Sequence, residues 1–415
     1  MSLASPGLIS LAYGSHGQFT CEVDPAQTIA SLTAPRPSSH FEQELQTALT
    51  RPLDFPPLGQ AVVSTDLVAI ALDRDTPESA TILAAIWEIL EQQGVEPGNV
   101  SVIQVPSPGS EGRPTLDPRE NLPEAVREDM QWTIHDPADK EHLSYLASTD
   151  KGDRVYLTRE LVEADFVMAA GRIAFDSVMG HIGTNSVYYP SLSSADAIAG
   201  ASGQGHSELG PTDVRPLRQV VDDVAWLLGS MFSVQVIPSA AGGAARILAG
   251  ASDSVFQLGK HYLAEEWMIE LDERAEMVVA AVDVDAGGHG WDQVARALEA
   301  ARNLVARDGK IVILSELAEE LGPGIELIAR SDSPVDAIRP LRELLPPDLV
   351  PATQLANAVD WADVYLLSRL DSETVDNLFM IPLDGESEVE RLLDEGGTCV
   401  FLESAQHTCG RIRSK

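Results

Sequence analysis

Apolar residues in the first half of the chain form short unbroken runs instead of alternating with polar residues. Leu67–Leu72, Val100–Val105 and Phe166–Ala170 are of this kind, and such runs are typical of strands buried on both faces. Between the first two, Ala80–Gln93 places its apolar residues at helical spacing, and Gly94 ends it. The pattern predicts a βαβ unit with parallel strands.

The second half repeats this pattern. Met277–Val284 reads as a buried strand, Trp291–Arg307 as a helix and Lys310–Leu314 as the next strand. The alternation continues through Ile338–Leu345, which we expect to be helical only from about Pro340 on. Further elements are predicted at Thr353–Asn357, Val364–Leu367, Val375–Asn377 and, as the last strand, Val400–Leu402. In the first half, Leu217–Leu228 and Val255–Leu271 are predicted helices that flank a strand at Phe232–Ile237.

A chain of 415 residues is too long for a single hydrophobic core. We place a boundary at the charged segment Asp272-Glu273-Arg274 and predict two α/β domains, residues 1–272 and 273–415. Each is expected to hold a mostly parallel sheet flanked by helices, with a ligand cleft between the domains.

The charge is strongly acidic, with 64 Asp and Glu against 28 Lys and Arg and a formal net charge of −36. Such a field repels nucleic acid and anionic membranes, so we expect neither as a partner. The apolar run Leu8–Ala12 is too short for a signal peptide, and no run approaches the ~20 residues of a membrane span. We therefore expect a cytoplasmic protein; homo-oligomerisation stays open. The same field works against anionic substrates, so a small anionic metabolite is expected as the ligand only where basic residues are gathered locally.

Three cysteines, Cys21, Cys399 and Cys409, lie far apart and indicate no disulfide framework. Cys399, His407 and Cys409 have a loose metal-ligand spacing, but purely structural roles are the more common outcome for such residues.

A long segment rich in Gly, Ser, Asn and Tyr follows the strand Phe166–Ala170 and starts at Gly171. Long irregular loops after buried strands are where α/β proteins keep ligand sites. The alternative is a surface crossover in which Gly180, Gly183 and Pro190 only make turns. The sequence leaves both interpretations open.

Two turns precede helices, Asp73–Glu78 and Asp285–Gly290. In the first, Thr76 is predicted as the N-cap and Pro77 as the first helical residue. In the second, the amides of Gly287 and Gly288, with Gln293 and Arg296, are candidates for holding a phosphate, although Arg296 is equally plausible as a solvated charge. Neither a P-loop nor G-x-G-x-x-G occurs, which argues against ordinary NTP or NAD binding.

From about Leu67 to Leu321, the order of these features resembles the nickel-dependent lactate racemase family. Asp73-Arg74-Asp75-Thr76-Pro77 is similar to that family's D-H-T-R-P turn. Laid over the family's next segment without a gap, the loop has the same residues at Gly171, Ile173, Gly180, Gly183 and Pro190. Gly287-Gly288 with Gln293 and Arg296 is similar to a later motif of the family. The resemblance implies racemase or epimerase chemistry on a small 2-hydroxy acid or sugar acid, with a nickel-pincer nucleotide as cofactor.

The chain departs from that family at its chemical positions. Ser186 stands where the resemblance implies the lysine that carries the pincer nucleotide, and a serine cannot form that amide. Asp176 replaces one histidine, and Glu111 falls near the position of another. The remaining histidine, a nickel ligand in the family, falls on His206 if four residues are inserted, and otherwise near Ser202. Covalent attachment of the cofactor is therefore doubtful, and which cofactor is bound stays open.

Two functions follow as expectations. The first is a divergent racemase or epimerase, and the alternative is a non-catalytic relative that binds a small anion, a nucleotide or merely a partner protein in the cleft. Metal-dependent hydrolysis at His181, His206 and Asp176 is a weaker third option. The candidate catalytic residues are Asp176, His181, His206 and Glu111, with His206 also the candidate metal ligand. The candidate cofactor-binding residues are Asp73, Thr76, Ser186, Gly287, Gly288, Gln293 and Arg296.

Overall fold

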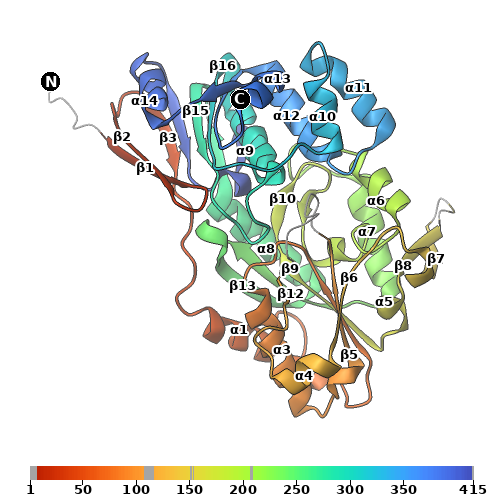
Figure 1. Ribbon diagram of the computed structural model, residues 1–415. Coiled ribbons are helices and arrows are strands. Elements are labelled where there is room, and N and C mark those ends of the chain that lie inside the picture. The colour runs from red at the N-terminus through yellow and green to blue at the C-terminus, as the bar shows by residue number, and fades with distance from the viewer. Residues whose placement is uncertain (1–6, 107–115, 150–151, 153, 206–208, 414–415) are drawn as a thin grey trace. The chain divides into compact units, whose positions relative to one another are not determined.

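The structure, a computed structural model, describes residues 7–106, 116–149, 152, 154–205 and 209–413. Contacts divide the chain into two units. The first unit comprises residues 36–239 and 243–263, and the second unit comprises the described residues up to 35, residues 240–242 and those from 264 on. Each unit contains a six-stranded sheet (Figure 1).

The sheet of the first unit has the strand order β13-β12-β9-β4-β5-β6. All neighbours are parallel except β12 and β13, which pair antiparallel. The strands are β4 (Val68–Leu72), β5 (Val100–Gln104), β6 (Gln131–Ile134), β9 (Phe166–Arg172), β12 (Phe232–Pro238) and β13 (Ala244–Ala251). The predicted βαβ unit is thus confirmed, and the carboxyl ends of β4, β9 and β12 meet at one edge of this sheet.

Helices cover this sheet, as the apolar spacing predicted. Ile82, Ile86 and Leu90 of α3 lie in one buried core with Ile70 and Val102 of the sheet. The helices of the first unit are α1 (Phe41–Thr50), α2 (Leu58–Ala61), α3 (Ser79–Gln92), α4 (Glu124–Asp129), α5 (Arg159–Glu163), α6 (Ala195–Ser202), α7 (Pro216–Leu228) and most of α8 (Ser252–Trp267). Two small antiparallel pairs accompany them, β7 (Leu143–Ser148) with β8 (Arg154–Thr158), and β10 (Ala174–Asp176) with β11 (Gly180–Ile182).

The sheet of the second unit is parallel throughout, with the order β18-β17-β16-β15-β19-β3. Its strands are β3 (Thr28–Leu32), β15 (Ala275–Ala281), β16 (Val305–Leu314), β17 (Asp363–Leu367), β18 (Ile381–Leu383) and β19 (Cys399–Leu402). Helices α9 (Trp291–Leu304), α10 (Pro323–Ala329), α11 (Pro334–Leu344), α12 (Leu349–Trp361), α13 (Ser372–Asn377) and α14 (Glu386–Asp394) alternate with them. The predicted α/β class, with mostly parallel sheets flanked by helices, is confirmed in both units.

The N-terminal strands belong to the second unit, which differs from the predicted division at residue 272. Strand β3 pairs with β19 at the edge of the second sheet, where an unpaired strand would expose its backbone groups. The hairpin of β1 (Gly7–Tyr13) and β2 (Gly17–Val23) buries Leu11 and Phe19 in a core with Val279 and Phe401. These contacts join segments almost four hundred residues apart, which local sequence patterns do not reveal.

Local predictions were wrong in several places, and α9 ends at Leu304 instead of Arg307. The helix predicted to run to Leu271 ends at Trp267, and Met268–Leu271 forms strand β14, paired with β20 (Cys409–Ile412), which follows the strand predicted to be the last. Helix α11 starts at Pro334 and contains Pro340 in its interior instead of starting there. No helix within the described ranges is both long and apolar enough to cross a membrane.

Candidate functional site

The turn after β4 has a different cap from the predicted one. Helix α3 starts at Ser79, and Thr76 donates its hydroxyl to the backbone carbonyl of Asp73 at 2.7 Å instead of capping the helix. Asp75 and Glu78 both have positive φ, 56° and 58°. These two left-handed residues keep the chain out of the helix for two residues longer than the Thr-Pro signal predicts.

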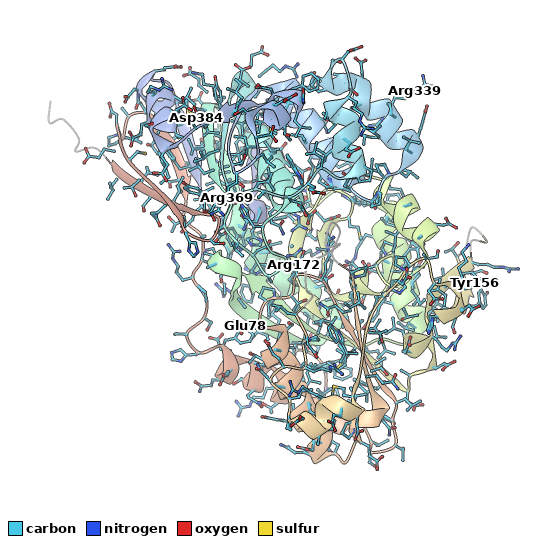
Figure 2. All side chains as sticks on the ribbon, in the orientation of Figure 1. Glu78, Tyr156, Arg172, Arg339, Arg369 and Asp384 are labelled. Carbon is cyan, nitrogen blue, oxygen red and sulfur yellow. The ribbon has the colours of Figure 1, made fainter. Side chains whose placement is uncertain are left out.

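A buried ion pair fixes this turn to β9. Arg172, labelled in Figure 2, lies in the interior of the first unit. It is 1% exposed and extends its Nη2 to Asp75 Oδ2 at 3.0 Å and its Nη1 to the Asp75 carbonyl at 3.4 Å. Its Nε has no hydrogen-bond partner in the described part of the chain. Because a buried guanidinium is very costly without a counter-charge, Asp75 is required here for structure.

Asp73 lies partly buried at the end of β4, beside the same arginine. Burial of its carboxyl raises the pKa to about 6, against the opposing effect of the Arg172 and Arg74 guanidinium groups. Gly171 makes room for this residue, because a Cβ there would lie 2.9 Å from the Asp73 Cβ. Gln235 of β12 is 1% exposed and has no partner for its Oε1 among the described residues. This edge of the first sheet therefore gathers polar groups, as the switch-point rule predicts.

The predicted loop after Gly171 begins with a short hairpin. Asp176 Oδ1 accepts hydrogen bonds from the backbone N–H groups of Val178 at 2.9 Å and Met179 at 2.6 Å. This is an Asx turn that joins β10 to β11. Asp176, a candidate proton carrier in the sequence, serves here to close a turn.

His181 on β11 is 6% exposed and packs between aromatic rings, with centroids 5.3 Å from Phe175 and 6.4 Å from Phe256. Burial lowers its pKa to about 4, and the charges of Lys260 and of nearby arginines lower it further, while a hydrogen bond with the Pro211 carbonyl opposes them. The imidazole is therefore neutral at pH 7.

Ser186 lies in a 3₁₀ helix, Thr184–Val187, and is 5% exposed. Its Oγ accepts the Gly183 N–H at 2.9 Å and donates to the Gly183 carbonyl at 3.3 Å. An alcohol that is buried and bonded twice to the backbone of its own turn does not fit the role of a covalent anchor for a pincer nucleotide.

A group of cations, which the sequence interpretation missed, lies beside this loop. Arg218 of α7 places its Cζ 3.8 Å from the centroid of the Phe256 ring, and the Lys260 Nζ lies 4.8 Å from the same centroid. Arg218 also binds Asp222 through Nε at 3.2 Å and Nη2 at 2.8 Å. The signal in the sequence was the spacing of Phe256 and Lys260, which puts both on one face of a helix.

In the second unit, the loop Asp285–Gly290 is closed by its own hydrogen bonds. The Gly287 N–H donates to Asp285 Oδ1 at 2.8 Å, and the Gly288 N–H donates to the Asp285 carbonyl at 2.9 Å. Gln293 spans the loop, with its Nε2 3.0 Å from Asp285 Oδ1 and its Oε1 accepting the Gly290 N–H at 3.0 Å. The donors proposed to hold a phosphate are thus already bonded within the protein.

Arg296 forms an ion pair with Asp292 one turn earlier on α9. A carboxylate at this position favours neither a phosphate nor another anion. Gly287 to Arg296 lie along one loop and helix, as the sequence indicates. The sequence did not indicate that Asp285 accepts hydrogen bonds from Gly287 and Gln293, or that Asp292 pairs with Arg296.

Glu111 and His206 lie outside the described residues. Within the described ranges, no group of three or more His, Cys, Asp and Glu side chains is placed to hold a metal ion, and this includes Cys399, His407 and Cys409. All three cysteines are free thiols.

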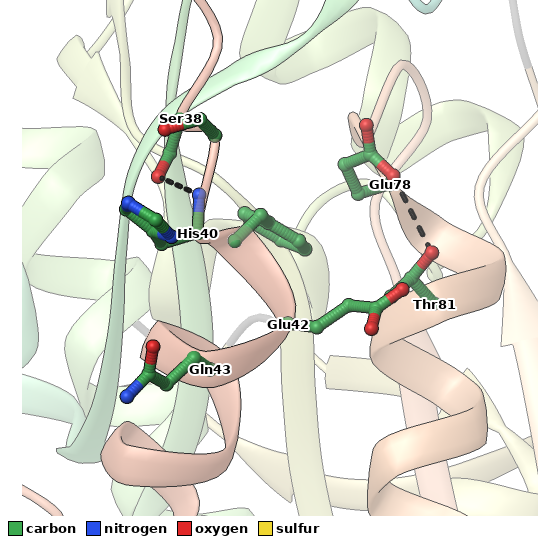
Figure 3. A pocket seen from close by; sticks show the side chains of 8 residues that line it. Ser38, His40, Glu42, Gln43, Glu78 and Thr81 are labelled. Carbon is green, nitrogen blue, oxygen red and sulfur yellow. Dashed lines mark hydrogen bonds between the residues drawn. The ribbon is translucent and has the colours of Figure 1, made fainter.

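A hollow of about 490 Å³ opens beside the start of α1 and α3 (Figure 3). It is lined by Ser38, Ser39, His40, Phe41, Glu42, Gln43, Glu78 and Thr81. Two carboxylates at the rim make it a poor anion site, and none of the candidate residues from the sequence lines it.

Comparison with known proteins gives three results. Residues 13–205 match the model of the lactate racemase N-terminal domain. The lactate racemase apoprotein from Thermoanaerobacterium thermosaccharolyticum is similar in structure with a TM-score of 0.82, at 18% identity over 98% of this chain and 100% of that one. A protein from Thermotoga maritima has a TM-score of 0.66, at 11% identity over 90% and 98% of the two chains. No curated protein matches the sequence.

Proposed function

We propose that this chain, which matches the lactate racemase N-terminal domain over residues 13–205 and has the fold of a lactate racemase apoprotein, binds a small anionic metabolite without a covalently attached nickel-pincer nucleotide. The ligand is held by side chains of the first unit, and no hydride transfer through a tethered group takes place.

The bonding of Ser186 is the observation that carries this proposal. The resemblance assigns the anchoring lysine to this position, yet the hydroxyl there is 5% exposed and bonded to both the N–H and the carbonyl of Gly183. A hydroxyl cannot form the amide that the attachment requires, and the Ser186 hydroxyl instead stabilises its own turn. The proton-transfer position is altered as well, because Asp176 closes the β10–β11 turn.

The distribution of charge supports binding in the first unit. In a chain with a net charge of −36, an anion is repelled unless cations are gathered locally. Arg218 and Lys260 are gathered around one ring of the first unit, whereas the donors of the second-unit loop are satisfied by Asp285 and Asp292.

The test uses the purified full chain. Its intact mass is expected to equal that of the polypeptide, without the near-ultraviolet absorption of a pincer nucleotide and without stoichiometric nickel. In parallel, the apparent melting temperature is measured with D-lactate, L-lactate and inorganic phosphate against sodium chloride of equal ionic strength. We expect stabilisation by at least one anion and no interconversion of the lactate isomers.

The racemase or epimerase interpretation makes the opposite prediction. A mass increment on the chain, bound nickel and interconversion of D- and L-lactate would together overturn the proposal and show that the loop is aligned to the family with a different register. If the chain carries no mass increment and no anion raises its melting temperature, anion binding itself is refuted.

A further inference from the structure

We propose that the outer edge of β1 (Gly7–Tyr13) pairs antiparallel with β1 of a second copy of this chain, so that two hairpins join into one four-stranded sheet. In the structure, β1 and β2 (Gly17–Val23) form a separate two-stranded sheet (Figure 1). Both strands belong to the second unit. The inference is therefore independent of the proposed function, which concerns the first unit.

The edge of β1 that faces away from β2 is open. The two strands pair over their whole length, from Gly7 opposite Val23 to Tyr13 opposite Gly17. In an antiparallel pair, every second residue of a strand directs its N–H and C=O away from the partner strand. Within the described residues, no other strand pairs with β1. Such an edge is a template for a further strand.

The hairpin is nevertheless held firmly in its unit. Leu11 is buried in the core that β1 shares with the six-stranded sheet, and the Tyr13 hydroxyl donates to Glu386 Oε1 at 2.7 Å. The side chains that alternate with these point outward, where Leu8 is 69% exposed and Ser10 is also exposed. Because one face is fixed by packing, the open edge presents its backbone groups in a defined geometry, which lowers the entropy cost of pairing.

The distribution of charge favours a second copy as the occupant. Although 22% of the chain is charged, residues 1–21 contain no Asp, Glu, Lys or Arg, and the first charged residue is Glu22. Edge strands are commonly protected from pairing by a charge or a proline, and β1 has neither. Two chains with a net charge of −36 repel each other least where their surfaces carry no charge. A basic partner strand, in contrast, would be attracted to the acidic remainder of the surface.

The strand is also complementary to itself. A two-fold axis that pairs all seven residues places Ser10 opposite the partner's Ser10 and Leu8 opposite the partner's Ala12. Glu22 lies opposite Leu8 within the hairpin, so its cross-strand row ends at the partner's Gln18 and not at a second glutamate. A two-fold contact requires this kind of self-complementarity, because the same surface is used twice.

The experiment is sedimentation velocity of the full-length protein across the micromolar range at physiological ionic strength. Ser10→Lys places an ammonium group at the proposed two-fold axis, where it lies opposite its own copy. Thr20→Lys is the matched control, because Thr20 is exposed, pairs directly with Ser10 and lies one strand away from the open edge. Both substitutions change the net charge equally. Circular dichroism confirms that each variant is folded.

We expect wild type and T20K to sediment with twice the chain mass of 44.5 kDa, and S10K to be monomeric or to dimerise about tenfold more weakly. Hydrogen exchange of wild type gives a second readout that needs no substitution. Protection of the amides of β1 should rise with protein concentration as the dimer forms.

A wild-type chain that stays monomeric over this range would overturn the inference. So would a dimer that S10K leaves intact, or a dimer whose formation does not change the protection of β1. Equal weakening by S10K and T20K would assign the effect to general surface charge and would also overturn pairing through this edge. None of these outcomes bears on anion binding, which the mass and melting measurements test separately.

Discussion

Replacing Asp73 with asparagine is expected to stabilise the protein at neutral pH. The carboxyl of Asp73 is partly buried at the end of β4, and its burial raises the pKa from an ordinary 3.8 to about 6. Above that pH the group is charged in the folded chain at a cost that the unfolded chain does not bear. Asparagine has nearly the same shape as the protonated acid, so it removes the charge and keeps the packing.

The size of the effect follows from the pKa. Each pKa unit corresponds to about 1.4 kcal/mol, so the charged Asp73 lowers the free energy of unfolding by at most about 3 kcal/mol at pH 7. Because the folded-state pKa is raised, the stabilising contribution of Asp73 is complete below about pH 4 and is lost as the pH rises through about 6. The D73N variant should therefore match wild type at pH 4 and exceed it at pH 7.

The assay is urea-induced unfolding of both proteins between pH 4 and pH 8, followed by circular dichroism. A gain of about 3 kcal/mol corresponds to a rise of roughly 6–12 °C in melting temperature for a unit of this size. The exposed Asp223 on α7 supplies the control, since D223N changes the net charge equally. A D73N variant that is no more stable than wild type at pH 7, or whose advantage persists at pH 4, would refute this reasoning.

Three further outcomes follow. The D75N change should lower the free energy of unfolding in urea by about 3–5 kcal/mol, because it leaves the 1%-exposed Arg172 without its counter-charge while asparagine tolerates the positive φ; a loss under 1 kcal/mol would mean that another group neutralises the arginine. The S186A change should cost about 1 kcal/mol by removing the acceptor of the Gly183 N–H, and hydrogen exchange should localise the loss to that turn. Because the folded-state pKa of His181 is lowered to about 4, its contribution is present above pH 6.5 and is lost as the pH falls to 4, so H181F should reduce this acid-side loss by about 3 kcal/mol; a pH profile identical to that of wild type would contradict the assignment.

The fold was largely predictable because local patterns dominate it. Uninterrupted apolar runs such as Leu67–Leu72, followed by helical spacing, correctly predicted parallel strands and the helices between them. The positions of β3 and β14 were not predictable in this way. They are edge strands whose partners, β19 and β20, lie far along the chain, so only long-range pairing defines them.

The polar turns and loops that follow buried strands were predictable from the sequence, but their hydrogen bonding was not. The sequence identified the turn at Asp73, the loop with Ser186 and the loop at Gly287 as polar segments after buried strands. It gave no sign that Arg172 would be buried against Asp75, since a lone arginine at a strand end is usually exposed. It also did not indicate that Asp285 would accept a hydrogen bond from the Gly287 N–H.

The sequence by itself determined the fold class and the family resemblance, because these depend on residue identity and on spacing along the chain. Only the tertiary structure decided which polar groups are already satisfied and which are not. That decision depends on neighbours from distant elements, as when α7 and α8 bring Arg218 and Lys260 to one ring and Asp222 pairs with Arg218. A charge is costly or harmless according to what surrounds it, and spacing along one chain does not specify its surroundings.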